Sequence, residues 1–232
     1  MTVSRPPGLF VTGTDTDVGK TFVACTIVRR LRAAGLRPGV YKPVASGGGS
    51  DGRDLWLAAG SPLDLERVCP QSFALPLAPH HAARSEGREV DDGLLEGGLA
   101  PWIESSDVVV VEGAGGLFSP LSPRLLNADL ACLLGLPVVV VDGGRLGCVG
   151  RVLATTIAAR ASDLDVAAVV VSQSVADDGR PASDPTAPAR IAADGACELR
   201  RRLGGIPVFL VPHGADATEP DADWMALAER RP

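Results

Sequence analysis

The sequence predicts an α/β protein in three layers, with a mostly parallel central sheet flanked by helices. Short valine-rich runs alternate with helix-length segments, the pattern expected of repeated strand–helix–strand units. The four-valine runs at 108–111 and 138–141 show no period of two, as expected of central strands that helices cover on both faces. Strands are expected at residues 9–12, 39–42, 108–112, 138–142, 166–172 and 206–211.

The segments between these runs predict the remaining elements. Longer helices are expected at residues 20–34, 146–161 and 189–203. Residues 63–103 contain several prolines and weaker periodicity, which indicates short helices. Residues 45–53 are rich in Gly and Ser, and residues 175–188 are rich in Asp, Pro and Ala, so both segments are expected to be mobile surface loops.

Composition limits the class of protein. The 232 residues are 46% hydrophobic and 22% charged, which suits one packed domain over residues 1–232. The formal net charge of −6 argues against a general nucleic-acid binder, whose binding face should be basic. No uncharged apolar run approaches the length of a membrane span, and the five cysteines form no CxxC pair. We therefore expect a cytoplasmic protein that binds neither membranes nor nucleic acid.

Residues 13–21 read Gly-Thr-Asp-Thr-Asp-Val-Gly-Lys-Thr and join an expected strand to an expected helix, the context of a phosphate-binding loop. Glycines let successive N–H groups turn inward, and the helix N-terminus adds partial positive charge. Lys20 is expected to reach the β- and γ-phosphates, and the Thr21 hydroxyl to ligate Mg²⁺. The sequence thus predicts a P-loop NTPase-like fold that binds ATP or another nucleoside triphosphate with Mg²⁺. The expected nucleotide-binding residues of the loop are Asp17, Val18, Gly19, Lys20 and Thr21.

Three further segments accompany this loop. The second expected strand ends in Lys42-Pro-Val-Ala-Ser46-Gly, Asp54 follows at the start of a helix, and a later strand ends in Glu112-Gly-Ala-Gly-Gly116. Together with the phosphate loop, this set resembles the dethiobiotin synthetase family over nearly the whole chain. Leu-Gly-Cys at 146–148 and Ile-Pro at 206–207 add weaker matches.

The resemblance implies a ligase reaction of biotin synthesis, in which 7,8-diaminopelargonic acid, CO₂ and ATP give dethiobiotin, ADP and phosphate. An amine captures CO₂ as a carbamate, the carbamate attacks the γ-phosphate, and the second amine closes the ureido ring from the mixed anhydride. Such chemistry depends mainly on positioning and on neutralising charge. The resemblance also implies a homodimer, with Mg²⁺ as cofactor and ATP as co-substrate.

The resemblance also implies a role for each matched residue. Lys42 lies between the carbamate and the γ-phosphate, where an ammonium stabilises both groups. The implied catalytic residues are Lys42, Lys20 and Thr16. The implied metal ligands are Thr21, Asp54 and Glu112. The implied substrate-binding residues are Thr16, Ser46, Gly147, Cys148 and Gly150, the last three presenting backbone N–H groups to the substrate carboxylate across a dimer interface. Further implied nucleotide-binding residues are Asp54, Glu112, Gly113, Ala114, Gly115, Gln173 and Pro207.

The chain departs from the family pattern at two places. It has Gly150-Arg151 where the family often has Asn-His, and Gln173-Ser174 where the family usually has Asn-Asp. Asp142 follows a valine run and is a rival metal ligand by position alone, although no family match supports it.

Two other functions remain open at this level. One is another ligase or synthetase of the same P-loop fold with a different substrate pocket. The other is a regulatory ATPase of the partitioning or cell-division kind, but Asp15, Thr16 and Asp17 stand where those proteins carry Lys-Gly-Gly. No Asn-Lys-x-Asp guanine motif is present, which argues against a GTPase switch.

Overall fold

A computed structural model describes residues 6–181, 183–215 and 222–230. Its central sheet has six strands in the order β2-β5-β1-β6-β7-β8, and every neighbouring pair is parallel. The strands are β1 (Gly8–Gly13), β2 (Pro38–Tyr41), β5 (Val108–Gly116), β6 (Val138–Asp142), β7 (Val166–Ser172) and β8 (Val208–Val211). The predicted parallel α/β fold is confirmed.

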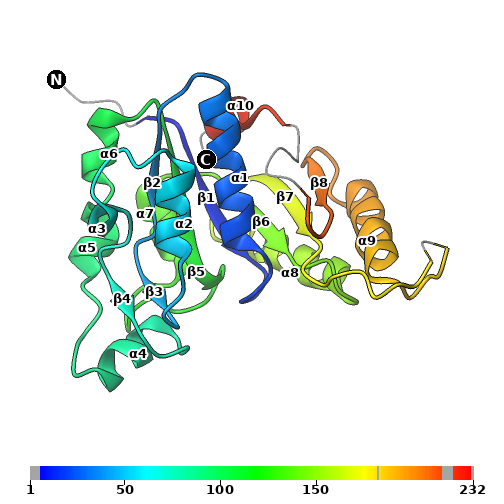
Figure 1. The fold of residues 1–232 in the computed structure, drawn as a ribbon, viewed down its shortest axis with the longest axis horizontal. Helices are drawn as coiled ribbons and strands as arrows, with labels where there is room; N and C mark the ends of the chain where they lie inside the picture. Colours follow the sequence, from blue (N-terminus) through cyan, green and yellow to red (C-terminus); the bar gives the residue numbers. More distant parts are fainter. Residues whose placement is uncertain (1–5, 182, 216–221, 231–232) are drawn as a thin grey trace.

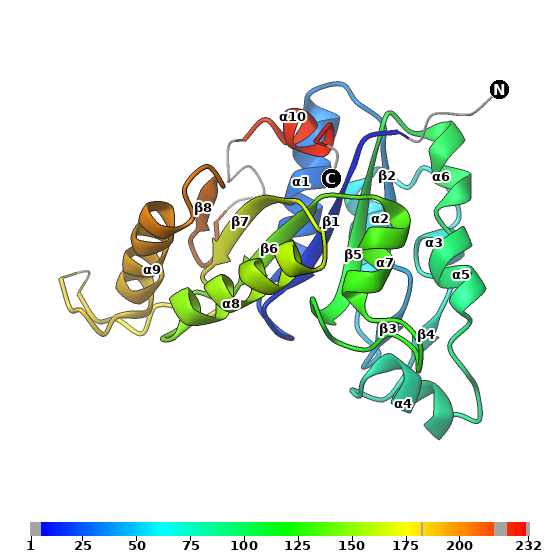
Figure 2. The same cartoon turned by 180° about the vertical axis from the view of Figure 1, so that it is seen from behind.

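Helices cover both faces of this sheet. α1 and α2 lie on one face, and α7 and α8 lie on the other (Figure 1, Figure 2). The longer helices are α1 (Lys20–Ala33), α2 (Asp51–Ala58), α7 (Asn127–Leu134), α8 (Cys148–Ala161) and α9 (Pro188–Arg202). The shorter ones are α3 (Leu65–Val68), α4 (Pro79–Ser85), α5 (Asp92–Gly97), α6 (Ala100–Ser105) and α10 (Trp224–Ala228). No helix of the described residues is long and apolar enough to cross a membrane.

The segment 45–53 differs from its prediction as a loop. It contains β3 (Ala45–Ser46), which pairs in parallel with β4 (Ser72–Phe73), and it ends in the first residues of α2. Pairing with a distant strand is not visible in a short Gly- and Ser-rich segment, because its partner lies far along the chain. The strand expected at 206–211 begins only at Val208.

The valine runs form the buried centre of the sheet. All eight valines at 108–111 and 138–141 are fully buried, as expected of β-branched residues in strands covered on both faces. Burying each such side chain contributes about 1.5–3 kcal/mol. Because the strands are parallel, their C-terminal ends meet at one edge, where the following loops can form a shared site.

Candidate active site

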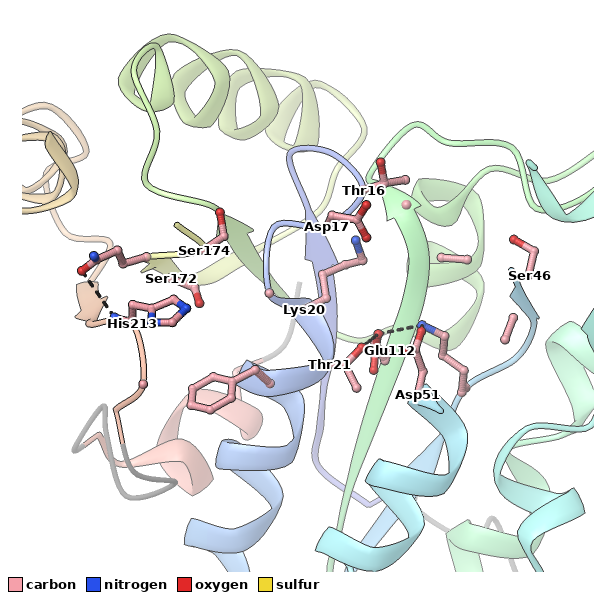
Figure 3. Close-up of a pocket in the computed structure, with 18 of the residues that line it drawn as sticks. Thr16, Asp17, Lys20, Thr21, Ser46, Asp51, Glu112, Ser172, Ser174 and His213 are labelled. Atoms are coloured by element: carbon pink, nitrogen blue, oxygen red, sulfur yellow. Dashed lines mark hydrogen bonds and ion pairs between the residues drawn. The ribbon is translucent and has the colours of Figure 1, made fainter. Parts of the chain in front are cut away.

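A cavity of about 670 Å³ opens at this C-terminal edge. Its walls come from the phosphate loop, the starts of α1 and α2, the ends of β5 and β7, and the loop after β8. Figure 3 shows Ser46 at one end of this cavity, His213 at the other, and Lys20 and Thr21 between them. The phosphate loop therefore divides the cavity into two halves.

The phosphate loop has the close packing that its glycines predict. Gly19 has a φ of +90°, and a Cβ there would lie 2.6 Å from the Ser172 hydroxyl oxygen. Lys20 Nζ donates a hydrogen bond to the Asp15 carbonyl at 2.9 Å, so the lysine is folded back over the loop. Burial, and then the neighbouring Lys42 cation, lower the pKa of Lys20. Phosphate oxygens would offset both effects by supplying negative charge.

A buried cluster of charged side chains adjoins this loop. Lys42 Nζ lies 2.6 Å from Glu112 Oε1 and 2.9 Å from Asp51 Oδ2. It also donates to the Gly113 carbonyl at 3.3 Å, and Thr21 Oγ1 donates to Glu112 Oε1 at 2.8 Å. Lys42 and Glu112 are almost completely buried, whereas Asp51 is partly exposed to the cavity. The segments meet because β2 and β5 are neighbours in the sheet.

The cluster keeps Lys42 charged. Burial by itself would lower the pKa of Lys42, but the carboxylates of Glu112 and Asp51 outweigh burial and raise it above the ordinary value. Burial would likewise raise the pKa of Asp51, but the charge and hydrogen bond of Lys42 lower it instead. The site therefore holds a fixed ammonium group at neutral pH.

The same cluster fits a magnesium ion. Glu112 Oε2 is buried and has no hydrogen-bond partner among the residues that the structure describes. In those residues, no three His, Cys, Asp or Glu side chains form a metal site by themselves. Two carboxylates and the Thr21 hydroxyl suit Mg²⁺, which usually takes few protein ligands together with phosphate oxygens and water.

Asp51, rather than the predicted ligand Asp54, lies within the cavity lining beside Lys42. Asp51 is the first residue of α2 and lines the cavity, whereas Asp54 lies about one turn further along and accepts a hydrogen bond from Ser50 Oγ at 2.6 Å. Two acidic residues three positions apart lie on the same side of a helix, so spacing cannot distinguish them. Because α2 begins with Asp51 at the cavity, Asp51 lines the cavity and Asp54, about one turn further along, does not.

Several of the other expected residues line the cavity. Thr16, Ser46, Ala114 and Gly115 line the cavity together with Asp17, and Ser46 Oγ also donates to the Leu77 carbonyl at 2.7 Å. Val18 belongs to the phosphate loop but is buried and does not line the cavity.

Two groups of predicted residues lie elsewhere. Pro207 precedes β8 and so lies at the opposite edge of the sheet, and Pro212, His213 and Gly214 line the cavity in its place. The Ile-Pro pair lies just before β8 begins, whereas the cavity lies at the C-terminal ends of the strands. Gly147, Cys148 and Gly150 open α8 outside the cavity lining of this chain.

The Gln173 amide lines the cavity but is already hydrogen-bonded. Its Nε2 donates to the Val175 carbonyl at 3.0 Å and to Asp177 Oδ1 at 2.9 Å. Its Oε1 accepts a bond from the His213 N–H at 3.3 Å. The side chain therefore joins the loops after β7 and β8. Sequence reasoning missed Phe22 and Ser172, which also line the cavity but belong to no motif, whereas Ser174 lines the cavity at the second position of the Gln173-Ser174 departure.

The fold and the phosphate loop define the class of protein, a P-loop NTPase-like nucleotide-binding protein. A family model described as an AAA domain matches residues 7–210. A protein of Anaeromyxobacter dehalogenans is 43% identical over 213 residues, 90% of this chain and 91% of that protein. One of Phenylobacterium zucineum is 40% identical over 233 residues, 96% and 95% of the two chains. Both are named ATP-dependent dethiobiotin synthetase BioD, and this chain belongs to that family.

Solved structures support the fold alone. The signal recognition particle receptor FtsY of Elizabethkingia anophelis superimposes with a TM-score of 0.53 at 16% identity, covering 97% of this chain and 65% of that one. Chloroplast FtsY of Physcomitrella patens gives a TM-score of 0.50 at 17% identity, covering 98% and 66%. This chain therefore spans about two thirds of the length of those chains.

Proposed function

We propose that this protein is an ATP-dependent dethiobiotin synthetase that carboxylates 7,8-diaminopelargonic acid with CO₂ and closes the ureido ring. One observation carries the proposal: the buried Lys42, whose pKa is raised by Glu112 and Asp51, lines the cavity together with Lys20 and Thr21 of the phosphate loop and with Ser46. The family's reaction requires a cation in that position, between a nucleotide and a second anionic reactant. The names of the relatives support the same activity.

The proposed reaction has three steps. One amine of the substrate adds to CO₂ and releases a proton, which leaves a carbamate. A carbamate oxygen then attacks the γ-phosphorus while the bond to the β–γ bridging oxygen breaks and ADP departs. The second amine attacks the carbonyl carbon of this carbamic–phosphoric anhydride, phosphate leaves, and loss of a proton completes the ring.

The side chains of the cavity would act mainly by charge and position. The Lys42 ammonium would attract the carbamate and the γ-phosphate together, and so reduce their mutual repulsion. Lys20 would leave the Asp15 carbonyl and bind the β- and γ-phosphates. Thr21, Asp51 and Glu112 would hold Mg²⁺, which neutralises phosphate charge when it is bound. Thr16 and Ser46 hydroxyls would hydrogen-bond the substrate.

The proposal is tested by measuring phosphate release with Mg-ATP and bicarbonate, with and without 7,8-diaminopelargonic acid. Product is followed by mass spectrometry. We expect substrate-dependent phosphate release that is matched one-for-one by dethiobiotin. ATP hydrolysis that the diamine neither stimulates nor converts to product would instead favour another P-loop synthetase or a regulatory ATPase.

The nucleotide site is expected to discriminate weakly between bases. Strong discrimination needs a polar group that the wrong base leaves unpaired, and both Gln173 N–H donors are already engaged inside the protein. Replacing ATP with GTP or CTP is therefore expected to change kcat/KM by no more than about tenfold, the low end of the roughly 10–200-fold that one apolar contact is worth. Steady-state assays with each triphosphate measure this ratio, and a hundredfold preference for ATP would contradict it.

A homodimer is also part of the proposal. Val149, Leu153 and Ile157 follow one another at helical spacing along α8, and Leu146 lies just before the helix; Leu146 and Ile157 are 84% and 66% exposed. Such an apolar stripe suits a protein interface. By family resemblance, the partner is a second copy, whose Gly147, Cys148 and Gly150 would reach the substrate carboxylate of the first.

An Ile157→Glu variant is expected to convert the dimer to a monomer, because a charge at the centre of an apolar interface would lose its hydration. Loss of one buried large apolar side chain and burial of a charge together cost several kcal/mol, enough to raise the dimer dissociation constant about a thousandfold. Light scattering coupled to size-exclusion chromatography measures the mass. Leu133→Glu on α7, where the leucine is 51% exposed, is the matched control and should leave the mass unchanged.

A further inference from the structure

The end of β6 carries a buried ion pair beside the phosphate loop. Asp142 is fully buried, and Arg151 reaches it with two nitrogens, Nε at 2.9 Å from Oδ2 and Nη2 at 3.0 Å from Oδ1. Thr14 Oγ1 donates to Oδ2 at 2.6 Å, and the Gly144 N–H donates to Oδ1 at 2.9 Å. Each carboxylate oxygen thus accepts two hydrogen bonds, so Asp142 is engaged inside the protein and is no rival metal ligand.

Arg151 also contacts the segment that opens α8. Its Nη1 donates to the Leu146 carbonyl at 3.1 Å, and its Nη2 to the Arg145 carbonyl at 3.4 Å. Arg151 occupies the first turn of α8, where the helix dipole disfavours a cation. The buried Asp142 carboxylate therefore accounts for its position, because an uncompensated buried charge is costly.

The ion pair joins segments that are far apart in the sequence. Thr14 and Asp142 are separated by 128 positions and meet because β1 and β6 are neighbours in the sheet. A second contact between the same two loops runs from Arg145 Nη2 to the Asp17 carbonyl at 3.4 Å. The start of the phosphate loop and residues 143–147 are thereby held in one fixed arrangement.

We propose that Arg151 is a positioning residue that fixes the phosphate loop through Asp142 and Thr14, and fixes the opening of α8 through the carbonyls of Arg145 and Leu146. The inference rests on the proposed function for the identity of the second substrate. Arg151 is outside the cavity lining, so it acts on binding rather than on the reacting atoms. A loop already held in its binding arrangement loses less conformational entropy when nucleotide binds.

Three variants and a control separate the connection from Arg151 to the phosphate loop from its connection to the opening of α8. Thr14→Val removes only the hydroxyl that contacts Asp142, Arg151→Met removes both connections, and Arg151→Lys keeps the charge. Arg230→Met is the control, because Arg230 pairs with Asp165 at 2.8 Å and is as exposed as Arg151, at 36%, but its partners Asp165 and Ala167 do not line the cavity. Calorimetry gives the dissociation constant of Mg-ATP, and initial rates give KM for ATP and the diamine.

We expect Thr14→Val to weaken ATP binding about fivefold, as for one lost hydrogen bond, and to leave KM for the diamine unchanged. Arg151→Met should weaken ATP binding at least about tenfold and raise KM for the diamine as well, with a smaller effect on kcat. Arg151→Lys should recover part of both losses. Arg230→Met should match the wild type.

Other results would overturn the inference. They are wild-type ATP affinity in Arg151→Met, or an equal loss of affinity in Arg230→Met. If Arg151→Met does not fold, Thr14→Val decides alone, since unchanged ATP affinity there would remove the connection to the phosphate loop. A wild-type protein that binds Mg-ATP but forms no dethiobiotin would contradict the proposed function, while the comparison of ATP affinities would still test the role of Arg151.

Discussion

A Lys42→Met variant is expected to lose about a thousandfold in kcat, the upper range for removing one preorganised charge-stabilising group. Methionine keeps most of the side-chain volume and removes the ammonium that contacts Glu112, Asp51 and the Gly113 carbonyl. The carboxylates of Glu112 and Asp51 would then repel the phosphates of the nucleotide, with no Lys42 ammonium to offset their charge. Initial rates of dethiobiotin formation at saturating substrates measure the loss.

Controls for this variant must separate chemistry from folding. Removing one partner of a buried ion pair is destabilising, so thermal unfolding should be measured with and without Mg²⁺. A conservative Lys42→Arg variant keeps the charge but not the point-like geometry, and should recover only part of the rate. A folded Lys42→Met protein with wild-type turnover would remove Lys42 from the proposed mechanism.

The Asp51→Asn variant is expected to lose about a hundredfold in kcat/KM and to need more Mg²⁺, because ligand and supporting groups of a metal site commonly contribute 10–100-fold each. Asparagine has the same shape but lacks the negative charge that faces Lys42 and adjoins Thr21. Rates measured across a magnesium titration would show a higher half-saturating concentration.

Asp54→Asn provides the matched control, because it makes the same change in the same helix three residues further on. Its carboxylate contacts Ser50 Oγ and not the Lys42 cluster, so activity and Mg²⁺ requirement should stay near the wild type. A larger loss of activity in Asp54→Asn than in Asp51→Asn would instead favour Asp54 as the magnesium ligand.

Features that depend on contiguous residues could be predicted from the sequence. The phosphate loop could be recognised because its strand, glycines and Gly-Lys-Thr are contiguous. The parallel sheet followed from valine runs that are apolar on both faces, and Glu112 could be found because it ends such a run. The family resemblance rested on the same contiguous motifs, and similarity to the named relatives confirms it.

Which polar groups meet at the C-terminal edge of the sheet depends on how the strands and helices pack. Asp51 rather than Asp54 contacts Lys42 because α2 begins with Asp51 at the cavity. Pro212 rather than Pro207 lines the cavity because Pro212 follows β8, and the C-terminal ends of the strands form the cavity. The pairing of Asp142 with Thr14 depends on strand order, because the two residues are 128 positions apart and no local pattern in the sequence brings them together. Local sequence limits backbone conformation and burial, whereas contacts between distant residues depend on how the strands and helices pack.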